Sequence, residues 1–224
     1  MKIFIGYDSR FPAPAEVAAY SLRKHSSIKL DISFLILADL VKEKGFDPEP
    51  DPKATTEFTR SRFLVPWLCG YEGKALFMDN DMVCLSDVKE LADLPLEGCS
   101  LRCVKHEYNP TETVKMYGCP QTVYPRKNWS SVMLMDCSKL RCWTKEVVEK
   151  SPCSRLHRFQ DLLDAQIGSL DPVWNQLDFL TNSSRGILHY TSGGPWYPAY
   201  ENCLHADLWR HYQEEWRFVE GAKK

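Results

Sequence analysis

The sequence has no apolar run approaching the roughly 18 residues that a membrane-spanning helix requires. No secretory leader precedes the first apolar segment, which reads Met-Lys-Ile-Phe-Ile-Gly and is typical of a β-strand. These two absences predict a cytoplasmic protein with no transmembrane segment.

An excess of charge of one sign is also lacking, because 28 Lys and Arg against 30 Asp and Glu give a net charge of −2. A nucleic-acid-binding surface requires a basic stripe, and none is visible, so we do not expect nucleic acid as a partner. With 11 Gly and 14 Pro among 224 residues, the chain has too little of either for a fibrous or disordered protein. The 44% share of hydrophobic residues is that of a globular protein with a substantial core.

Paired metal-binding cysteines are the third absence. The nine cysteines form no C-x-x-C pair, and their number is odd. This pattern predicts neither a zinc site nor a disulfide framework. We expect most of them to be buried thiols in a reducing compartment.

What is present is an alternation of strand and helix patterns. A β-rich segment at 2–7 precedes an amphipathic helical segment at 15–25, and a second β-rich segment follows at 29–37. A strand–helix–strand opening is typical of a parallel, three-layer α/β sheet. Further expected elements are strands at 74–78, 100–104 and 131–136, and helices from Thr56 to a break at Pro66, at 138–149, and around 208–216.

No repeat, low-complexity tract or linker divides the chain, so we expect a single domain over residues 1–224. The segment 105–126 contains several Pro and Gly and predicts a long, functional loop.

The most informative pattern is Asp79-Asn80-Asp81, which directly follows an apolar strand. Ligand crevices of open α/β sheets lie at the carboxyl ends of strands, where two carboxylates one residue apart can face the same way. Adjacent anions repel unless a cation lies between them, and a hard divalent ion with oxygen ligands suits them. A pair of solvated turn carboxylates is the plain alternative.

His189 is the second piece. A histidine near a strand end is commonly structural, but this one precedes Gly193-Gly194-Pro195. Glycines allow a backbone to approach a phosphate closely, and their N–H groups can bind its oxygens. A neutral imidazole among the ligands would favour Mn²⁺ over Ca²⁺.

With these pieces in view, the sequence resembles GT-A-fold glycosyltransferases, and in particular glycosyltransferase family 8. The resemblance covers most of the chain. It is carried in order by IFIGYDSR (3–10), FTRSRFLVPWL (58–68), LFMDNDMVCL (76–85), KNWSSVMLMD (127–136) and HYTSGGPW (189–196). It implies a Rossmann-like three-layer α/β/α fold with a mostly parallel mixed sheet. The nucleotide-binding part would span about 1–100 and the acceptor side about 101–224.

The resemblance also implies a set of ligand-binding residues. Asp79, Asp81 and His189 would hold Mn²⁺ or Mg²⁺. Implied contacts to the nucleotide and its diphosphate come from Tyr7, Asp8, Arg62, Asn80, Gly193 and Gly194. Arg60 is a rival to Arg62, and Asp8 can equally be the N-cap of the following helix.

The sugar site is implied less directly. Residues 129–132 correspond to the family's Asn-x-Gly-Val strand, but Asn128 lies one place early and Ser131 stands where glycine is expected. In the acidic segment that follows, Asp164 and Gln166 are the implied catalytic residues, and Asp161 is a further candidate. The family often has a lysine after the glycine of the last motif, where this chain has Trp196.

The function implied is transfer of a hexose or N-acetylhexosamine from a nucleotide-diphosphate sugar to an unknown carbohydrate or glycoconjugate acceptor. The resemblance favours a UDP-sugar donor and retention of the anomeric configuration. An inverting GT-A glycosyltransferase and a non-catalytic nucleotide-sugar-binding module remain as alternatives.

Overall fold

The structure is a computed structural model that describes residues 1–111, 113–121, 123–179 and 184–222. Its main sheet has six strands in the order β2-β1-β3-β8-β5-β9. These strands span Lys2–Gly6 (β1), Asp31–Leu35 (β2), Lys74–Met78 (β3), Leu101–Cys103 (β5), Val132–Asp136 (β8) and Ile167–Ser169 (β9). Strands β2, β1 and β3 are mutually parallel, whereas β8 runs antiparallel to both β3 and β5. The expected mixed sheet is confirmed.

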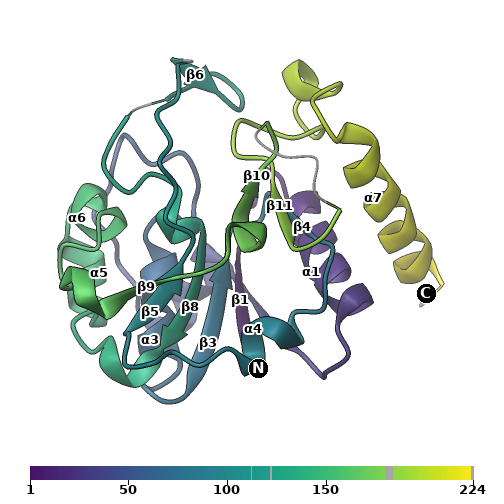
Figure 1. Ribbon diagram of the computed structural model, residues 1–224. Helices are drawn as coiled ribbons and strands as arrows, with labels where there is room; N and C mark the ends of the chain where they lie inside the picture. The colour runs from purple at the N-terminus through teal and green to yellow at the C-terminus, as the bar shows by residue number, and fades with distance from the viewer. Residues whose placement is uncertain (112, 122, 180–183, 223–224) are drawn as a thin grey trace.

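Two small sheets complete the strands. Antiparallel pairing joins β4 (Met82–Cys84) to β11 (Ile187–His189), which in turn pairs with β10 (Gln176–Leu177). A short hairpin joins β6 (Val114–Lys115) to β7 (Cys119–Pro120). Figure 1 shows this hairpin beyond the carboxyl end of β1, on the same side as the end of β11.

The helices cover both faces of the main sheet (Figure 1). They span Ala13–His25 (α1), Leu37–Lys44 (α2), Val65–Leu68 (α3), Lys89–Asp93 (α4), Lys145–Lys150 (α5), Cys153–His157 (α6) and Ala206–Gly221 (α7). None of these described helices is both long and apolar enough to cross a lipid bilayer.

The three layers follow from the period of two in the strands. In β3, Ala75 and Phe77 face a core cluster that includes Phe63 and Trp143, near α3 and α5. Leu76 faces the other cluster, beside α1. Because both faces of the sheet are buried, the strands read as continuous apolar runs. The three-layer α/β/α architecture is confirmed.

Two expected helices are wrong in extent. The segment from Thr56 forms turns and a 3₁₀ helix at Ser61–Leu64, and Pro66 lies in the first turn of α3 instead of ending a helix. Proline fits that position because its missing N–H has no intrahelical partner there. In the expected helix 138–149, only the part from Lys145 is α-helical, because Trp143 turns into the core and Thr144 caps α5, while the segment begins with a 3₁₀ helix at Cys137–Lys139.

The expected C-terminal helix is present as α7. Trp209 and Tyr212 are buried against Val17 of α1 and against Tyr190. The core-facing interpretation of this helix is therefore confirmed for these two side chains. In the expected loop 105–126, residues 112 and 122 lie outside the described residues.

Candidate metal and nucleotide site

Asp79 and Asp81 occupy the link between the main sheet and the second sheet. Strand β3 ends at Met78 and β4 begins at Met82. The Asp79 N–H donates to the Ser131 carbonyl at 2.9 Å, and the Asp81 carbonyl accepts from Tyr190 N–H at 2.9 Å. Both carboxylates are therefore fixed by backbone contacts and buried, as is Asn80 between them.

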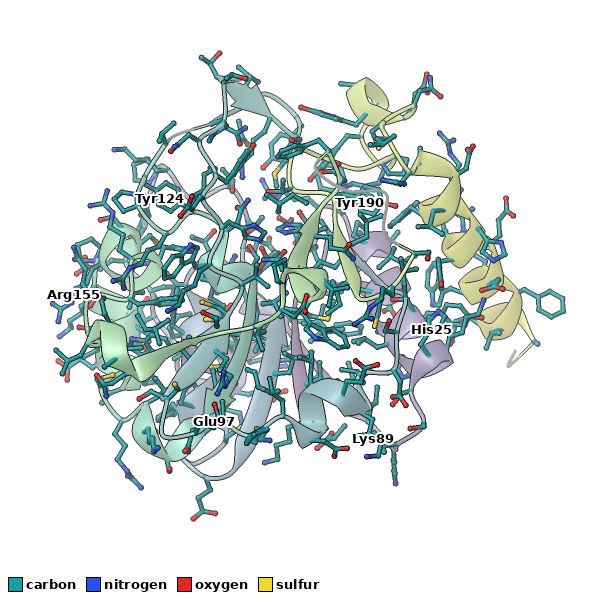
Figure 2. The ribbon with its side chains drawn as sticks, in the orientation of Figure 1. His25, Lys89, Glu97, Tyr124, Arg155 and Tyr190 are labelled. Carbon is teal, nitrogen blue, oxygen red and sulfur yellow. The ribbon has the colours of Figure 1, made fainter. Side chains whose placement is uncertain are left out.

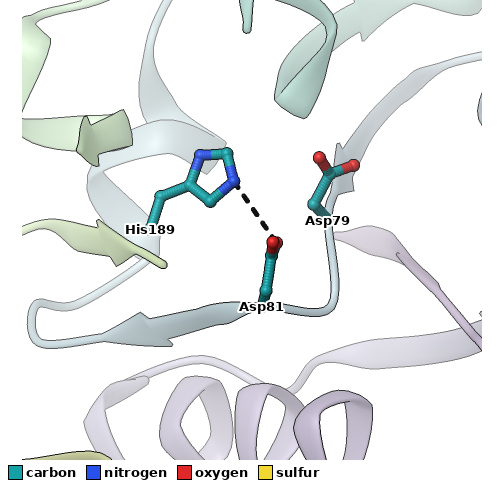
Figure 3. Close-up of side chains that lie close together, drawn as sticks. All are labelled: Asp79, Asp81 and His189. Carbon is teal, nitrogen blue, oxygen red and sulfur yellow. Dashed lines mark ion pairs between the residues drawn. The ribbon is translucent and has the colours of Figure 1, made fainter. Parts of the chain in front are cut away.

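Strand pairing brings His189 to this link. His189 ends β11 and pairs with Met82 of β4, so its side chain lies beside Asp81. Its Nε2 is 3.3 Å from Asp81 Oδ1 (Figure 3). One ligand atom from each of Asp79, Asp81 and His189 lies within 4.8 Å of the others. The structure thus brings together the three residues expected to bind a metal.

The chemistry of this cluster fits a divalent cation. Oδ1 of Asp79 and Oδ1 of Asp81 are both buried, and neither accepts a hydrogen bond from a described residue. Buried carboxylate oxygens without donors are costly, and a bound cation would satisfy them. Two ligands of one metal ion lie at most about 4–5 Å apart, which matches the observed spread. Two oxygens and one imidazole suit Mn²⁺ or Mg²⁺.

The pKa values of Asp79 and His189 reflect their burial and the charged groups close to them. Burial, only partly offset by the Arg62 guanidinium, raises the pKa of Asp79 to about 6. Burial lowers the pKa of His189, but the Asp81 and Asp79 carboxylates outweigh it, so that pKa is raised. In the absence of a cation, the imidazole therefore tends to hold the proton that offsets the carboxylate charge.

Asn175 orients the histidine. It is fully buried in a 3₁₀ turn before β10, and its Oδ1 lies 2.9 Å from His189 Nδ1. Its Nδ2 donates to the Asn128 carbonyl at 3.1 Å. An acceptor at Nδ1 fixes the tautomer that leaves the Nε2 lone pair toward Asp81.

The two candidate arginines point to different places. Arg62 Nη1 lies 2.7 Å from Asp79 Oδ1, out of line for a hydrogen bond, and it also donates to the Ser130 carbonyl at 3.1 Å. Arg60 donates to the carbonyls of Val148 and Ser151. Arg62 therefore faces the metal cluster, whereas Arg60 joins the start of the 3₁₀ helix at Ser61–Leu64 to α5.

The residues after β1 lie at the carboxyl edge of the same sheet. Asp8 is buried, and Arg10 Nε donates to its Oδ1 at 2.7 Å. The N-cap alternative for Asp8 is wrong, because α1 begins at Ala13 after Pro12. The Tyr7 ring packs on Phe34, with centroids 5.5 Å apart.

The glycine pair after β11 is required by packing. Gly193 has a φ of 137°, which side chains rarely adopt, and a Cβ on Gly194 would lie 2.0 Å from the Trp196 ring. The pair therefore allows Trp196 to fold back on its own backbone. Contact of these glycines with a phosphate stays a prediction.

The candidate catalytic residues of the acidic segment, Asp161, Asp164 and Gln166, contact residues other than those of the metal cluster. Asp164 is exposed and pairs with Arg126, whereas Asp161 pairs with Arg155. Gln166 Oε1 accepts from Leu163 N–H at 2.9 Å. Among the described residues, no hydrogen bond or ion pair joins Asp161, Asp164 or Gln166 to the three metal-site residues, and their catalytic role stays a prediction.

Sequence reasoning missed three residues near the cluster. These are Asn175, Asp178 and Lys115. Asp178 is buried just after β10, its N–H donates to the His189 carbonyl at 3.0 Å, and burial raises its pKa to about 6. An amide and a carboxylate flanking the two-residue strand β10 were the available signal, but the sequence gives no partner for them.

The fold defines a class of protein. The chain superposes over 95% of its length on 59% of the glycosyltransferase GlyE from Streptococcus pneumoniae TIGR4, with a TM-score of 0.62 and 18% identity. It matches the galactosyltransferase LgtC, solved with donor and acceptor sugar analogues, over 96% of both chains, with a TM-score of 0.61 and 14% identity. The chain has the fold of GT-A glycosyltransferases, as the resemblance to family 8 predicted.

A more similar relative identifies the family. Protein CDI of Arabidopsis thaliana is 43% identical over 227 residues, which cover 96% of this chain and 86% of that protein. The chain belongs to the family of Protein CDI. No protein-family model matches the sequence. The chain spans about three-fifths of the length of GlyE, so that protein's full activity is not carried over.

Proposed function

We propose that the protein is a metal-dependent glycosyltransferase that uses a nucleotide-diphosphate sugar. The observation that supports this most is the convergence of Asp79, Asp81 and His189 in a GT-A fold. Two strand ends about 110 positions apart in sequence meet there, and Oδ1 of each buried aspartate accepts no aligned hydrogen bond from a described residue. A chance pair of turn carboxylates would be solvated instead.

The three cluster residues would hold a divalent cation, and we favour Mn²⁺ because imidazole is one of the ligands. A cation bound there would offset the charge that develops on the departing nucleotide diphosphate. Arg62 would bind the diphosphate next to Asp79. We assign Tyr7 and Asp8 to the base and ribose, Asn80 to the region near the metal, and the Gly193–Gly194 backbone to the phosphates.

In the proposed reaction, the bond between the anomeric carbon and the diphosphate oxygen breaks, and a bond to the acceptor oxygen forms. The acceptor hydroxyl attacks on the face from which the diphosphate leaves, so the anomeric configuration is retained. Its proton passes to the departing phosphate oxygen, so no base is required behind the sugar. Asp164 or Gln166 would steady the sugar, an assignment that rests on the resemblance. The donor we favour is a UDP-hexose or UDP-N-acetylhexosamine, with a carbohydrate or glycoconjugate acceptor.

Release of nucleoside diphosphate from a panel of nucleotide sugars tests the proposal. We expect slow hydrolysis with Mn²⁺, none with EDTA, and at least a hundredfold loss for Asp81→Asn. Lys139→Met, on the surface away from the cluster, serves as the control. Metal-independent release, or full release by Asp81→Asn, would contradict the proposal. Tight donor binding without release would favour the non-catalytic binding module, and proton NMR of the first-formed product distinguishes retention from inversion.

A further inference from the structure

The segment after β11 carries no cationic side chain, although it lies directly against the metal cluster. Residues 189–196 read HYTSGGPW. A diphosphate carries several negative charges, and one divalent cation facing two aspartates offsets only part of them. If the site binds a nucleoside diphosphate, lysine or arginine side chains from other elements must contribute.

The β6–β7 hairpin reaches this segment from the middle of the chain. Met116 N–H donates to the Ser192 carbonyl at 2.7 Å, which ties the hairpin to the residues after His189. The Tyr117 ring lies 5.7 Å from those of Phe11 and Tyr197, and its hydroxyl contacts the Arg10 guanidinium. The hairpin is therefore held both to the turn after β1 and to the turn after β11 (Figure 1).

Lys115 precedes the tethered residue of this hairpin and is half-buried. Burial lowers the pKa of Lys115, while the charges of Asp81 and Asp79 raise it. The bond from the next residue, Met116, to the Ser192 carbonyl places Lys115 in the part of the hairpin that contacts the segment after His189. Among the described residues, however, no ion pair of 4.0 Å or less joins Lys115 to Asp79 or Asp81. A bound anion would complete this arrangement, because it would lie between the ammonium and the metal.

A second lysine lies in the same region. Lys127 is buried, with its Nζ 5.0 Å from the centre of the Tyr124 ring, which is labelled in Figure 2. Burial and, to a smaller extent, the positive charge of Lys115 lower the pKa of Lys127 to about 8. The next residue, Asn128, is held by Asn175, the residue that orients the metal-site histidine. Two lysines that repel each other beside the cluster are stabilised when an anion binds between them.

We propose that Lys115, together with Lys127, binds the diphosphate of the nucleotide ligand beside the metal cluster. This inference rests on the proposed function, since it assumes that the cluster binds a metal and a diphosphate. It assigns the missing cation to the hairpin instead of to the glycine segment.

Calorimetric titration of the full chain in saturating Mn²⁺ tests the assignment. The probe is whichever of UDP, GDP and ADP binds the wild type best, compared with its monophosphate. We expect Lys115→Met to weaken diphosphate binding about tenfold or more and monophosphate binding less than about threefold, because only the diphosphate spans the site. Lys127→Met should show the same selectivity, and Lys115→Arg should retain most of the affinity. Lys139→Met, on the surface, is the matched control.

Lys105 provides a rival assignment, because it too lies in the 105–126 segment. Its Nζ donates to the Ile167 carbonyl at 2.7 Å, so we expect no diphosphate-selective loss from Lys105→Met. Unchanged diphosphate affinity in Lys115→Met, with an unfolding temperature near that of the wild type, overturns the inference while leaving the glycosyltransferase proposal intact. Diphosphate binding that depends on Lys115, without turnover of any donor, supports the inference and contradicts the proposed function. A wild type that binds no diphosphate overturns both.

Discussion

Replacing Asn175 by alanine tests how the protein orients the histidine of its metal cluster. The Asn175 side chain makes two buried hydrogen bonds, at 2.9 Å with His189 Nδ1 and at 3.1 Å to the Asn128 carbonyl. Alanine removes both, which leaves the buried His189 Nδ1 without its partner, whereas the Asn128 carbonyl still accepts from Ser131 N–H at 3.3 Å. The imidazole then loses the contact that fixes its tautomer and ring orientation.

The magnitude follows from these two contacts. One buried group left unsatisfied costs roughly 1–3 kcal/mol and the loss of an ordinary hydrogen bond about 0.5–1.5 kcal/mol, so we expect the free energy of unfolding to fall by about 2–4 kcal/mol without metal. Loss of a group that orients a metal-binding histidine typically weakens metal affinity about 10- to 100-fold. We therefore expect Asn175→Ala to remain folded at low temperature and to bind Mn²⁺ one to two orders of magnitude more weakly than the wild type.

The assay is titration of Mn²⁺ followed by electron paramagnetic resonance, which counts free metal directly, with circular dichroism to verify folding. Asn175→Asp should recover part of the affinity, because it keeps an acceptor for the Nδ1 proton. Asn202→Ala is the matched control, since this exposed amide contacts only Glu201 among the described residues. Unaltered Mn²⁺ affinity in a folded Asn175→Ala chain would refute the argument that this amide orients His189.

Three further outcomes are expected. Arg60→Met should lower the unfolding temperature by several degrees, with little change in Mn²⁺-dependent donor affinity, because Arg60 contacts α5. Arg62→Met should weaken donor binding about tenfold or more, because Arg62 faces Asp79. If the two variants had equal effects in calorimetry and in thermal unfolding, the assignment of separate roles to the two arginines would be wrong. Mn²⁺ affinity should rise from pH 6 to pH 8, because nearby carboxylates raise the pKa of His189 and only the neutral imidazole binds metal. A flat pH profile in calorimetry would count against His189 as a ligand. Gly194→Ala should lower the free energy of unfolding, measured in urea, by more than about 2 kcal/mol, because the added methyl group would overlap the Trp196 ring. Stability equal to that of the wild type would show that the backbone at Gly194 can shift to accommodate the methyl group.

Local sequence patterns were sufficient for β3, but they gave no bounds for the short strands β4, β10 and β11 beside it. The apolar run 74–78 predicted β3 with its boundaries, and the two aspartates that follow it were expected at a strand end. This works because a buried strand needs continuous apolar side chains, and polar groups mark where the strand leaves the core. Helix boundaries were less well predicted, as at Pro66, because the same residue can begin or end a helix depending on where the chain turns.

The sequence motifs predicted which residues form the metal site, but not how the fold brings them together. Whether His189 lies beside Asp81 or far from it depends on the pairing of β11 with β4, which joins segments about 100 positions apart. Local propensity does not specify such long-range pairing, since it forms only when both strands bury their faces against the same core. The contact of Asn175 with His189 and the bond between the β6–β7 hairpin and Ser192 could not be predicted for the same reason.

The sequence by itself therefore determined the main strands of the α/β fold, the acidic pair at a strand end and the resemblance to a family. Only the tertiary structure decided which of two arginines faces Asp79, which amide holds the histidine, and that the β6–β7 hairpin is bonded to the segment after His189. The physical reason is that composition and periodicity fix which side chains leave water, whereas the direction of each polar group is set by neighbours that only the packed chain brings within contact distance.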